Sequence, residues 1–259
     1  MKRLPIPATG EKRRIISCLP GWLMAMALTW SVGPAHAIEG GTLAQANDLL
    51  ARATVAVGTL VQPDGSLRLS RCSGALIAPD LVLTAAHCIR GNPVGAVVGL
   101  YQGSRRIAST HRVAAAARHA VGSGHLASRD LADMLNEISL DVAVLRLETP
   151  VRGRKPLRLA DRSQGIPSTL QLAGVGLSGR AAGSLKTATL RPLAVTETGL
   201  IIARTVGARV CMGDSGGPVV IPSRSGPRLV GLASAVITPQ APCGNILMIA
   251  PATIGSPQL

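Results

Sequence analysis

Residues 210–220, VCMGDSGGPVV, constrain this chain more than any other stretch of its sequence. Three glycines stand close to Ser215, and glycine adopts backbone conformations that residues with a Cβ avoid. The amides of Gly213 and Ser215 could therefore be directed at one point. Two such N–H donors can hold the negative oxygen that develops during acyl transfer. The same stretch could also be a glycine-rich turn before a strand that starts at Pro218, so other residues must decide.

A base and an orienting group for Ser215 stand upstream in the sequence. A serine hydroxyl is a weak nucleophile, and it is activated by a neighbouring base that a third residue orients. His87 follows an apolar run in TAAHC, and Asp141 begins the alternating segment DVAVLRL. Taken singly, His87 could be a core histidine and Asp141 could cap a strand. Their joint occurrence with Ser215 favours a catalytic triad over these alternatives.

With these three motifs the sequence resembles the trypsin/chymotrypsin-like serine proteases, in which the triad residues occur in the order His, Asp, Ser. The matching segments are residues 72–88, 140–147, 173–176 and 211–243. The resemblance implies an all-β fold of two six-stranded antiparallel β-barrels that pack together and contain little helix. It places His87 and Asp141 in an N-terminal barrel, residues 38–150, and Ser215 in a C-terminal barrel, residues 151–259.

The resemblance also implies a reaction. We expect a serine endopeptidase that hydrolyses peptide bonds of protein or peptide substrates through an acyl-enzyme on Ser215, with His87 as the base and Asp141 as its orienting group. The resemblance implies no cofactor and no metal. The alternative is a catalytically silent binding module with the trypsin fold. Ala235 favours this alternative, since the family commonly carries tryptophan there, whereas the intact triad favours the enzyme.

Three residues correspond to the substrate pocket of the resembling family: Arg209, Ser234 and Val236. Arg209 stands at the position of the pocket base, where a buried guanidinium would need an anionic partner such as an acidic substrate side chain. Val236 replaces the usual glycine of the pocket wall, and its branched side chain should narrow the entrance. Two preferences therefore stay open for the substrate residue before the scissile bond (P1), a small aliphatic or an acidic one.

The cysteines predict a disulfide framework. Cys18 lies in an N-terminal segment that we expect to be removed, which leaves four cysteines. The resemblance pairs Cys72 with Cys88 and Cys211 with Cys243. Such bonds persist in an oxidising compartment. A Cys/His metal site is the competing interpretation, but the sequence contains no Cys-x-x-Cys or His-x-x-x-His spacing.

Residues 1–37 have the composition of a secretory signal peptide. Basic residues come first, the apolar run from Trp22 to Trp30 follows, and small residues end the segment at Ala35-His36-Ala37. The apolar run is short for a bilayer span, so we expect no stable membrane insertion after cleavage. An uncleaved anchor is the alternative. Cleavage would deliver a secreted or periplasmic protein.

The sequence IEGG, which starts at Ile38, follows this segment directly and looks like the mature N-terminus of the resembling family. In that family the new α-amino group pairs with the aspartate beside the nucleophile, here Asp214. Glu39 departs from the usual aliphatic second residue. If the signal is cut after Ala37, export itself would generate the amine of Ile38.

The chain carries a formal net charge of +14, which would favour acidic partners. Its basic residues are mostly arginines that are scattered along the sequence. No aromatic platform for stacked bases accompanies them, since the chain has one Tyr, two Trp and no Phe, and both Trp precede residue 38. We therefore expect no nucleic-acid partner. As a separate expectation, the protein is a monomer.

Short apolar segments bounded by turn residues predict many strands. The predicted strands are residues 54–61, 73–77, 81–84, 170–174, 187–195, 200–204, 218–221, 229–236 and 246–250. Helical spacing of apolar residues from Leu131 to Ile138 predicts a short amphipathic helix before Asp141, and residues 44–53 could form a short helix or a loop. The segment 148–160, with two prolines and a glycine, is predicted to link two halves.

Overall fold

The computed structural model describes residues 37–62, 66–91, 93–118, 130–178, 181–237 and 243–256. The chain divides into two compact units, residues 1–33 and 34–259, and all the described residues lie in the second unit. The predicted signal segment therefore lies outside the described residues, apart from Ala37. None of the described helices has the length and apolar character needed to cross a lipid bilayer.

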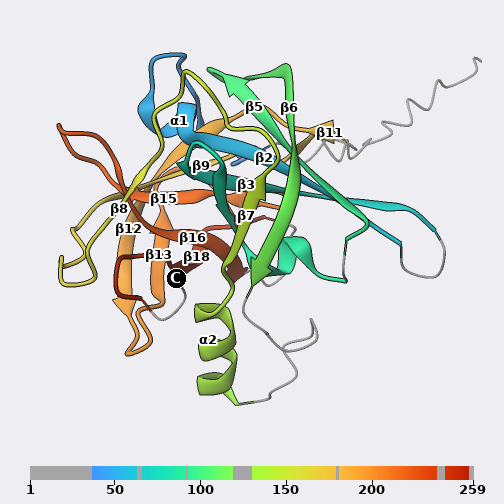
Figure 1. Ribbon diagram of the computed structural model, residues 1–259. Coiled ribbons are helices and arrows are strands. Elements are labelled where there is room, and N and C mark those ends of the chain that lie inside the picture. Colours follow the sequence, from blue (N-terminus) through green and yellow to red (C-terminus); the bar gives the residue numbers. More distant parts are fainter. Residues whose placement is uncertain are drawn as a thin grey trace, which may run out of the picture. The chain divides into compact units, whose positions relative to one another are not determined.

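The first barrel closes from six antiparallel strands, drawn from blue to yellow-green in Figure 1. The strands are β2 (Thr54–Val61), β3 (Arg68–Ala78), β4 (Leu81–Thr84), β5 (Gly95–Gln102), β6 (Arg105–Arg118) and β7 (Ala143–Leu147), and they pair in the order β2-β3-β4-β7-β6-β5. Aliphatic side chains such as Val55, Leu76, Leu83 and Leu145 fill its interior. Closure leaves no long unpaired edge, so these side chains can all be shielded from water.

The second barrel is built in the same way from six strands of the C-terminal half. These are β9 (Leu170–Gly174), β12 (Lys186–Val195), β13 (Ile201–Thr205), β15 (Pro218–Ile221), β16 (Arg228–Ile237) and β18 (Ile246–Pro251). They pair in the order β9-β12-β13-β18-β16-β15, and β15 returns to β9. Two short strands join this barrel, β1 (Thr42–Leu43) beside β12 and β8 (Arg158–Leu159) beside β16. The first residues after Ile38 thus pair with the second barrel.

Short elements surround the barrels. Asp48 caps α1 (Leu49–Ala53), and Asp130 caps α2 (Leu131–Ser139) by accepting a hydrogen bond from the Ala132 amide. The apolar face of α2 packs on β18 through Ile138 and Met248, and Figure 1 shows the helix beyond the end of β7. The remaining elements are the 3-10 turn η2 (Ala86–Ile89) and the strand pairs β10 (Leu177–Ser178) with β11 (Ala181–Ala182) and β14 (Val210–Cys211) with β17 (Cys243–Gly244).

The predicted two-barrel, all-β architecture is confirmed. Each predicted strand lies at a strand of the structure, and the bounds of β2, β4, β9 and β15 agree residue for residue. The predicted helix before Asp141 is α2. β5 and β6, which together span most of residues 95–118, are not predicted by the sequence pattern. β6 is mostly exposed and rich in alanine and polar residues, so it lacks the alternation that identifies a half-buried strand.

Candidate active site

His87 and Asp141 are held together by two hydrogen bonds. His87 lies in η2, directly after β4, and Asp141 lies between α2 and β7. The His87 ring nitrogen Nδ1 is 2.7 Å from Asp141 Oδ2, and the His87 backbone amide donates to Asp141 Oδ1 at 2.8 Å. Because β4 and β7 are paired, with Thr84 opposite Ala143, the two residues meet at the same end of the first barrel.

Asp141 is buried and ionised. Burial by itself would raise the pKa of its carboxyl. The hydrogen bonds from the His87 ring, from Ser234 and from the His87 amide, together with the charge of His87, more than offset this effect, so the pKa lies below its ordinary value. The Ser234 hydroxyl donates to Oδ2 at 2.5 Å. An ionised Asp141 can hold Nδ1 of His87 in its protonated form, which leaves Nε2 free to accept a proton.

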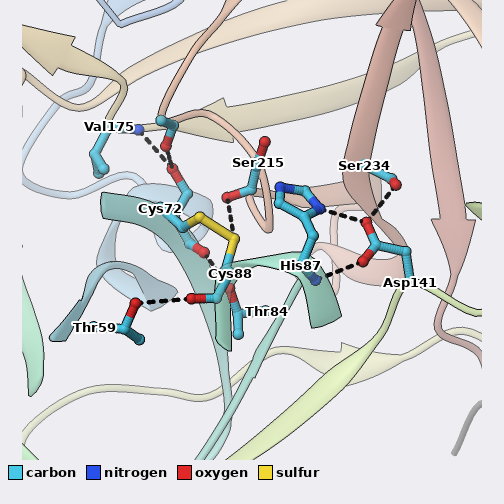
Figure 2. The surroundings of a disulfide bond; sticks show 11 residues. Thr59, Cys72, Thr84, His87, Cys88, Asp141, Val175, Ser215 and Ser234 are labelled. Carbon is cyan, nitrogen blue, oxygen red and sulfur yellow. Dashed lines mark hydrogen bonds and ion pairs between the residues drawn. A yellow bond between two sulfur atoms is a disulfide. The ribbon is translucent and has the colours of Figure 1, made fainter. Parts of the chain in front are cut away.

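Ser215 lies in the turn between β14 and β15 of the second barrel. In Figure 2 its side chain lies on the side of the His87 ring that faces away from Asp141. The carbonyl of Ser215 accepts the Ser73 amide at 2.8 Å, and the amide of Gly216 donates to Ala233 at 2.7 Å. Gly216 has a φ of +78°, and a Cβ there would collide with the Ser73 carbonyl and the Thr84 hydroxyl. The turn that carries Ser215 therefore requires glycine at position 216.

The amides of Gly213 and Ser215 have no hydrogen-bond partner within the part of the chain that the structure describes. Unpaired N–H groups are uncommon in folded proteins unless water or a ligand binds them. Gly213 has a φ of +89°, and a Cβ there would lie 2.6 Å from the carbonyl carbon of Gly176. Glycine at this position thus permits both the turn and its close approach to the neighbouring loop. The two free donors can bind an oxyanion.

Asp214 lies beside the predicted mature N-terminus. Its Oδ2 accepts the amide of Ile38 at 3.1 Å and the amide of Cys211 at 2.8 Å, whereas its Oδ1 is buried without a partner among the described residues. Burial raises the pKa of the Asp214 carboxyl to about 7, against the effect of the Cys211 and Ile38 amides. Ile38 itself is fully buried and has a φ of +22°, a strained value for a β-branched residue.

A cavity of about 110 Å³ opens beside Ser215. Its walls are almost entirely small or aliphatic, and the lining residues are Val210, Cys211, Met212, Ser215, Ala233, Ser234, Ala235, Val236 and Leu247. Two of the predicted pocket residues, Ser234 and Val236, line it. Arg209 does not, which differs from the sequence-based expectation. Its guanidinium instead pairs with the exposed Glu39 carboxylate at 3.2 Å and donates to the Cys243 carbonyl at 2.7 Å.

Both disulfides that the resemblance implied are present. Cys72 is bonded to Cys88, and Cys211 is bonded to Cys243. The first bridge ties β3 to η2, the turn of His87, and the second links β14 to β17 beside the cavity. Two groups of side chains in the described residues have metal-like spacing, but both contain a disulfide, so their sulfurs are not free thiolates.

Two contacts at the candidate site are not evident from the sequence. Ser234, a predicted pocket residue, also binds Asp141 through its hydroxyl. Ser73, which no motif in the sequence indicates, contacts the turn of Ser215 from the first barrel. Each contact joins residues that are more than 90 positions apart in the chain, so local patterns could not reveal it.

Comparisons with known proteins identify the family of this chain. The Trypsin family model matches residues 40–253. A protein named trypsin from Saccharopolyspora erythraea is 30% identical over 197 residues, which cover 68% of this chain and 78% of the relative. A protein named brachyurin from Leptuca pugilator is 29% identical over 170 residues, which cover 57% of this chain and 70% of the relative.

Solved structures show the same fold at low sequence identity. The structure of HL collagenase matches with a TM-score of 0.63 and 22% identity, over 83% of this chain and 93% of its own. The scabies mite inactivated protease paralogue S-I1 matches with a TM-score of 0.57 and 22% identity, over 81% and 93%. The family match covers both barrels and includes His87, Asp141 and Ser215. This chain therefore belongs to the trypsin family of serine-type peptidases.

Proposed function

We propose that this chain is a secreted or periplasmic serine endopeptidase. The observation that carries the proposal is the pairing of His87 with an ionised Asp141 on the side of the ring opposite Ser215. Family membership alone would not suffice, because a trypsin fold can be retained without turnover. The arrangement of the three side chains supports an intact catalytic apparatus.

In the proposed mechanism Ser215 Oγ attacks the carbonyl carbon of the scissile peptide bond, and His87 Nε2 takes the hydroxyl proton. The carbonyl oxygen becomes an oxyanion, which the Gly213 and Ser215 amides bind. His87 then returns the proton to the leaving amine, and an acyl-enzyme is left on Ser215. Water, deprotonated by His87, hydrolyses this ester and restores Ser215. Asp141 stabilises the imidazolium in both steps and remains ionised.

The cavity beside Ser215 favours a small aliphatic P1 residue. Its volume is about 110 Å³, and Val210, Ala233 and Leu247 give it an apolar wall. Transfer of an aliphatic side chain into such a site contributes about 25 cal/mol per Å² of buried apolar area. An acidic P1 residue would lose its hydration without a cation in return, because Arg209 is bound to Glu39 and Cys243.

The surroundings of Asp214 support activation by removal of the N-terminal segment. A buried carboxylate that faces an amide nitrogen at 3.1 Å would gain a full charge partner if that nitrogen were an ammonium. A cut between Ala37 and Ile38 would supply this ammonium and would release the strained φ of Ile38. Ala37 and Ile38 are at most 1% exposed, so the cut has to precede their burial. Signal cleavage during export would meet this requirement, and no separate activating protease would be needed.

The decisive experiment is labelling with a fluorophosphonate probe. Secreted, N-terminally sequenced protein should be labelled at Ser215, and a Ser215→Ala variant should not. A peptide library should then be cleaved by the wild type alone. If correctly processed, folded protein takes up no label and cleaves no peptide, the alternative of a catalytically silent binding module replaces the proposal. The inactivated protease paralogue among the structural matches has this fold.

A further inference from the structure

Ser73 lies in the first barrel, behind the turn that carries Ser215. It follows Cys72 in β3, and it is completely buried. Its hydroxyl donates to the Gly213 carbonyl at 2.9 Å and accepts the Val175 amide at 2.9 Å. Gly213 and Val175 belong to two different loops of the second barrel. One hydroxyl of the first barrel thus holds two loops of the second.

The backbone of Ser73 makes two more contacts. Its amide donates to the Ser215 carbonyl at 2.8 Å, and its carbonyl accepts the Thr84 hydroxyl at 2.8 Å. Thr84 is the last residue of β4, which leads into the turn of His87. Ser73 therefore contacts the turn of Ser215 directly. Through the Thr84 hydroxyl it also contacts β4, the strand that leads to His87.

The Gly213 carbonyl needs an external restraint. Gly213 has a φ of +89°, in a region that glycine reaches without steric cost, so the residue itself does little to fix the neighbouring peptide planes. Asp214 restrains the loop on one side through the Cys211 amide. The Ser73 hydroxyl restrains it on the other side by binding the carbonyl of the Gly213–Asp214 peptide, whose amide donates to the Cys211 carbonyl at 3.1 Å. This peptide is joined through the Gly213 Cα to the peptide that carries the Gly213 N–H, one of the two free donors.

We propose that the Ser73 hydroxyl is a positioning group for the oxyanion site, which aims the Gly213 N–H at the reacting carbonyl oxygen from the opposite barrel. This inference rests on the proposed function. Ser73 is completely buried, so it acts through Gly213 and Val175 and not on the substrate directly. Its hydroxyl has both a donor partner and an acceptor partner, so the effect does not depend on a titrating group. A hydrogen bond with a purely structural role would stabilise the fold. It would not stabilise the transition state more than it stabilises the bound substrate.

The test compares Ser73→Ala with Thr54→Val. Thr54 is equally buried in the same barrel, and its hydroxyl donates to the Leu50 carbonyl at 2.8 Å, far from Gly213 in the chain. Ser73→Ala should lower kcat by roughly 10- to 100-fold with KM changed less than about twofold, because the lost restraint weakens a donor that acts in the transition state. Affinity for a peptide boronate, which forms a tetrahedral adduct, should fall by the same factor. Affinity for the cleaved product peptide should be unchanged.

Thr54→Val should lower the thermal stability and leave kcat near the wild-type value. Ser73→Thr, which keeps a hydroxyl, should recover most of the lost kcat. Wild-type kcat in Ser73→Ala, an effect on KM alone, or an equal loss of kcat in Thr54→Val would each overturn the proposal. If neither Ser73→Ala nor Ser73→Gly folds, Ser73 is required for folding and the positioning role is abandoned.

A second measurement separates this proposal from the proposed function. If the wild type shows no turnover that depends on Ser215, the proposed function fails, and hydrogen exchange of the amides of residues 211–217 tests Ser73 instead. Exchange in this loop should be faster in Ser73→Ala than in Thr54→Val. Equal exchange in the two variants would overturn the positioning role even in a silent protein.

Discussion

The Ser234 hydroxyl and the His87 ring bind the same carboxylate oxygen, Oδ2 of Asp141, at 2.5 and 2.7 Å. Asp141 precedes β7 of the first barrel, whereas Ser234 belongs to β16 of the second. The ionised state of Asp141 thus depends on the packing of the two barrels. Any displacement between them would remove a donor from the group that orients His87.

Ser234→Ala should reduce activity and alter the pH dependence of stability. The pKa of Asp141 is lowered in the folded protein, so its contribution to stability is present above its unfolded pKa and is lost as pH falls through the folded pKa. Without the Ser234 hydroxyl the folded pKa moves back toward its ordinary value. The contribution near pH 7 is then smaller, by roughly 1.5 to 3 kcal/mol for a hydrogen bond to a charged group.

Urea denaturation of the wild type and of Ser234→Ala across pH 3–7 measures this difference. The gap in unfolding free energy should be largest near pH 7 and should shrink toward pH 3. Ser223→Ala is a matched control, because the Ser223 hydroxyl is exposed and bonds only within its own turn. A gap that does not change with pH would contradict the coupling to Asp141.

Val236→Gly should widen the P1 specificity. Val236 lines the cavity beside Ser215 on β16, and loss of its two methyl groups would make room for a larger side chain. We expect the ratio of kcat/KM for P1 Phe over P1 Val to rise at least about 10-fold, which corresponds to about 1.4 kcal/mol. Val206→Gly, at an exposed valine away from this cavity, should leave the ratio unchanged. Fast cleavage after Phe by the wild type would show that the cavity does not limit P1.

Arg209→Ala should leave the P1 preference as it is. The guanidinium bonds with the exposed Glu39 and with the Cys243 carbonyl, and it lies outside the cavity beside Ser215. The values of kcat/KM for P1 Val and P1 Glu substrates should therefore change by the same factor. A selective loss of cleavage after Glu would reinstate Arg209 as a specificity residue.

The motifs around His87, Asp141 and Ser215 can be recognised in the sequence because each depends on a short run of residues. The glycines around Ser215 are required by positive φ values and by close contacts that a Cβ would prevent. A turn of this shape therefore needs glycine at these positions, and the spacing of the glycines can be recognised in the sequence. The strands of the second half were predictable for a similar reason, since each is a short aliphatic segment and turn residues separate one segment from the next.

Side-chain directions around the cavity beside Ser215 were not predictable. The distance in sequence from Ser215 predicts Arg209 at the pocket base, yet Val210 lines the cavity and Arg209 does not. Successive residues of a strand point to opposite faces, so a shift of one position in the sequence moves a side chain from the face of the cavity to the opposite face. Arg209 and Val210 stand where β14 begins, and the pairing of Val210 with Gly244 fixes which of them points inward.

The two disulfides should account for every cysteine of the mature chain. A chain that begins at Ile38 contains Cys72, Cys88, Cys211 and Cys243, all of which are bonded. Thiol titration of denatured, unreduced protein should therefore find no free thiol. Cys211→Ala should impair kcat more than Cys72→Ala, because Cys211 lies in the loop of Gly213 and its amide holds Asp214. Two or more free thiols per chain would contradict the framework.

The last prediction concerns a form in which Met-Ala precedes Ile38. In this form Ile38 contributes an amide, and the Asp214 carboxyl has a pKa of about 7 in place of its ordinary 3.8. A raised folded-state pKa means that Asp214 contributes stability below its unfolded pKa, and that this stability is lost as pH rises through about 7. The extended form should therefore lose up to roughly 4 kcal/mol between pH 4 and pH 8. Asp214→Asn in the extended form should abolish this slope.

The form that begins at Ile38 should behave differently, because its ammonium pairs with the ionised Asp214. The pairing raises the pKa of the amine above its free value of about 8, so the loop should stay ordered at neutral pH and be lost only as pH rises through that raised value. Unfolding free energies and kcat of the two forms from pH 4 to pH 10 test this directly. At pH 8 the mature form should be active and the extended form should be nearly inactive. Full activity of the extended form at pH 8, or a secreted protein whose N-terminus is not Ile38, would contradict activation by export.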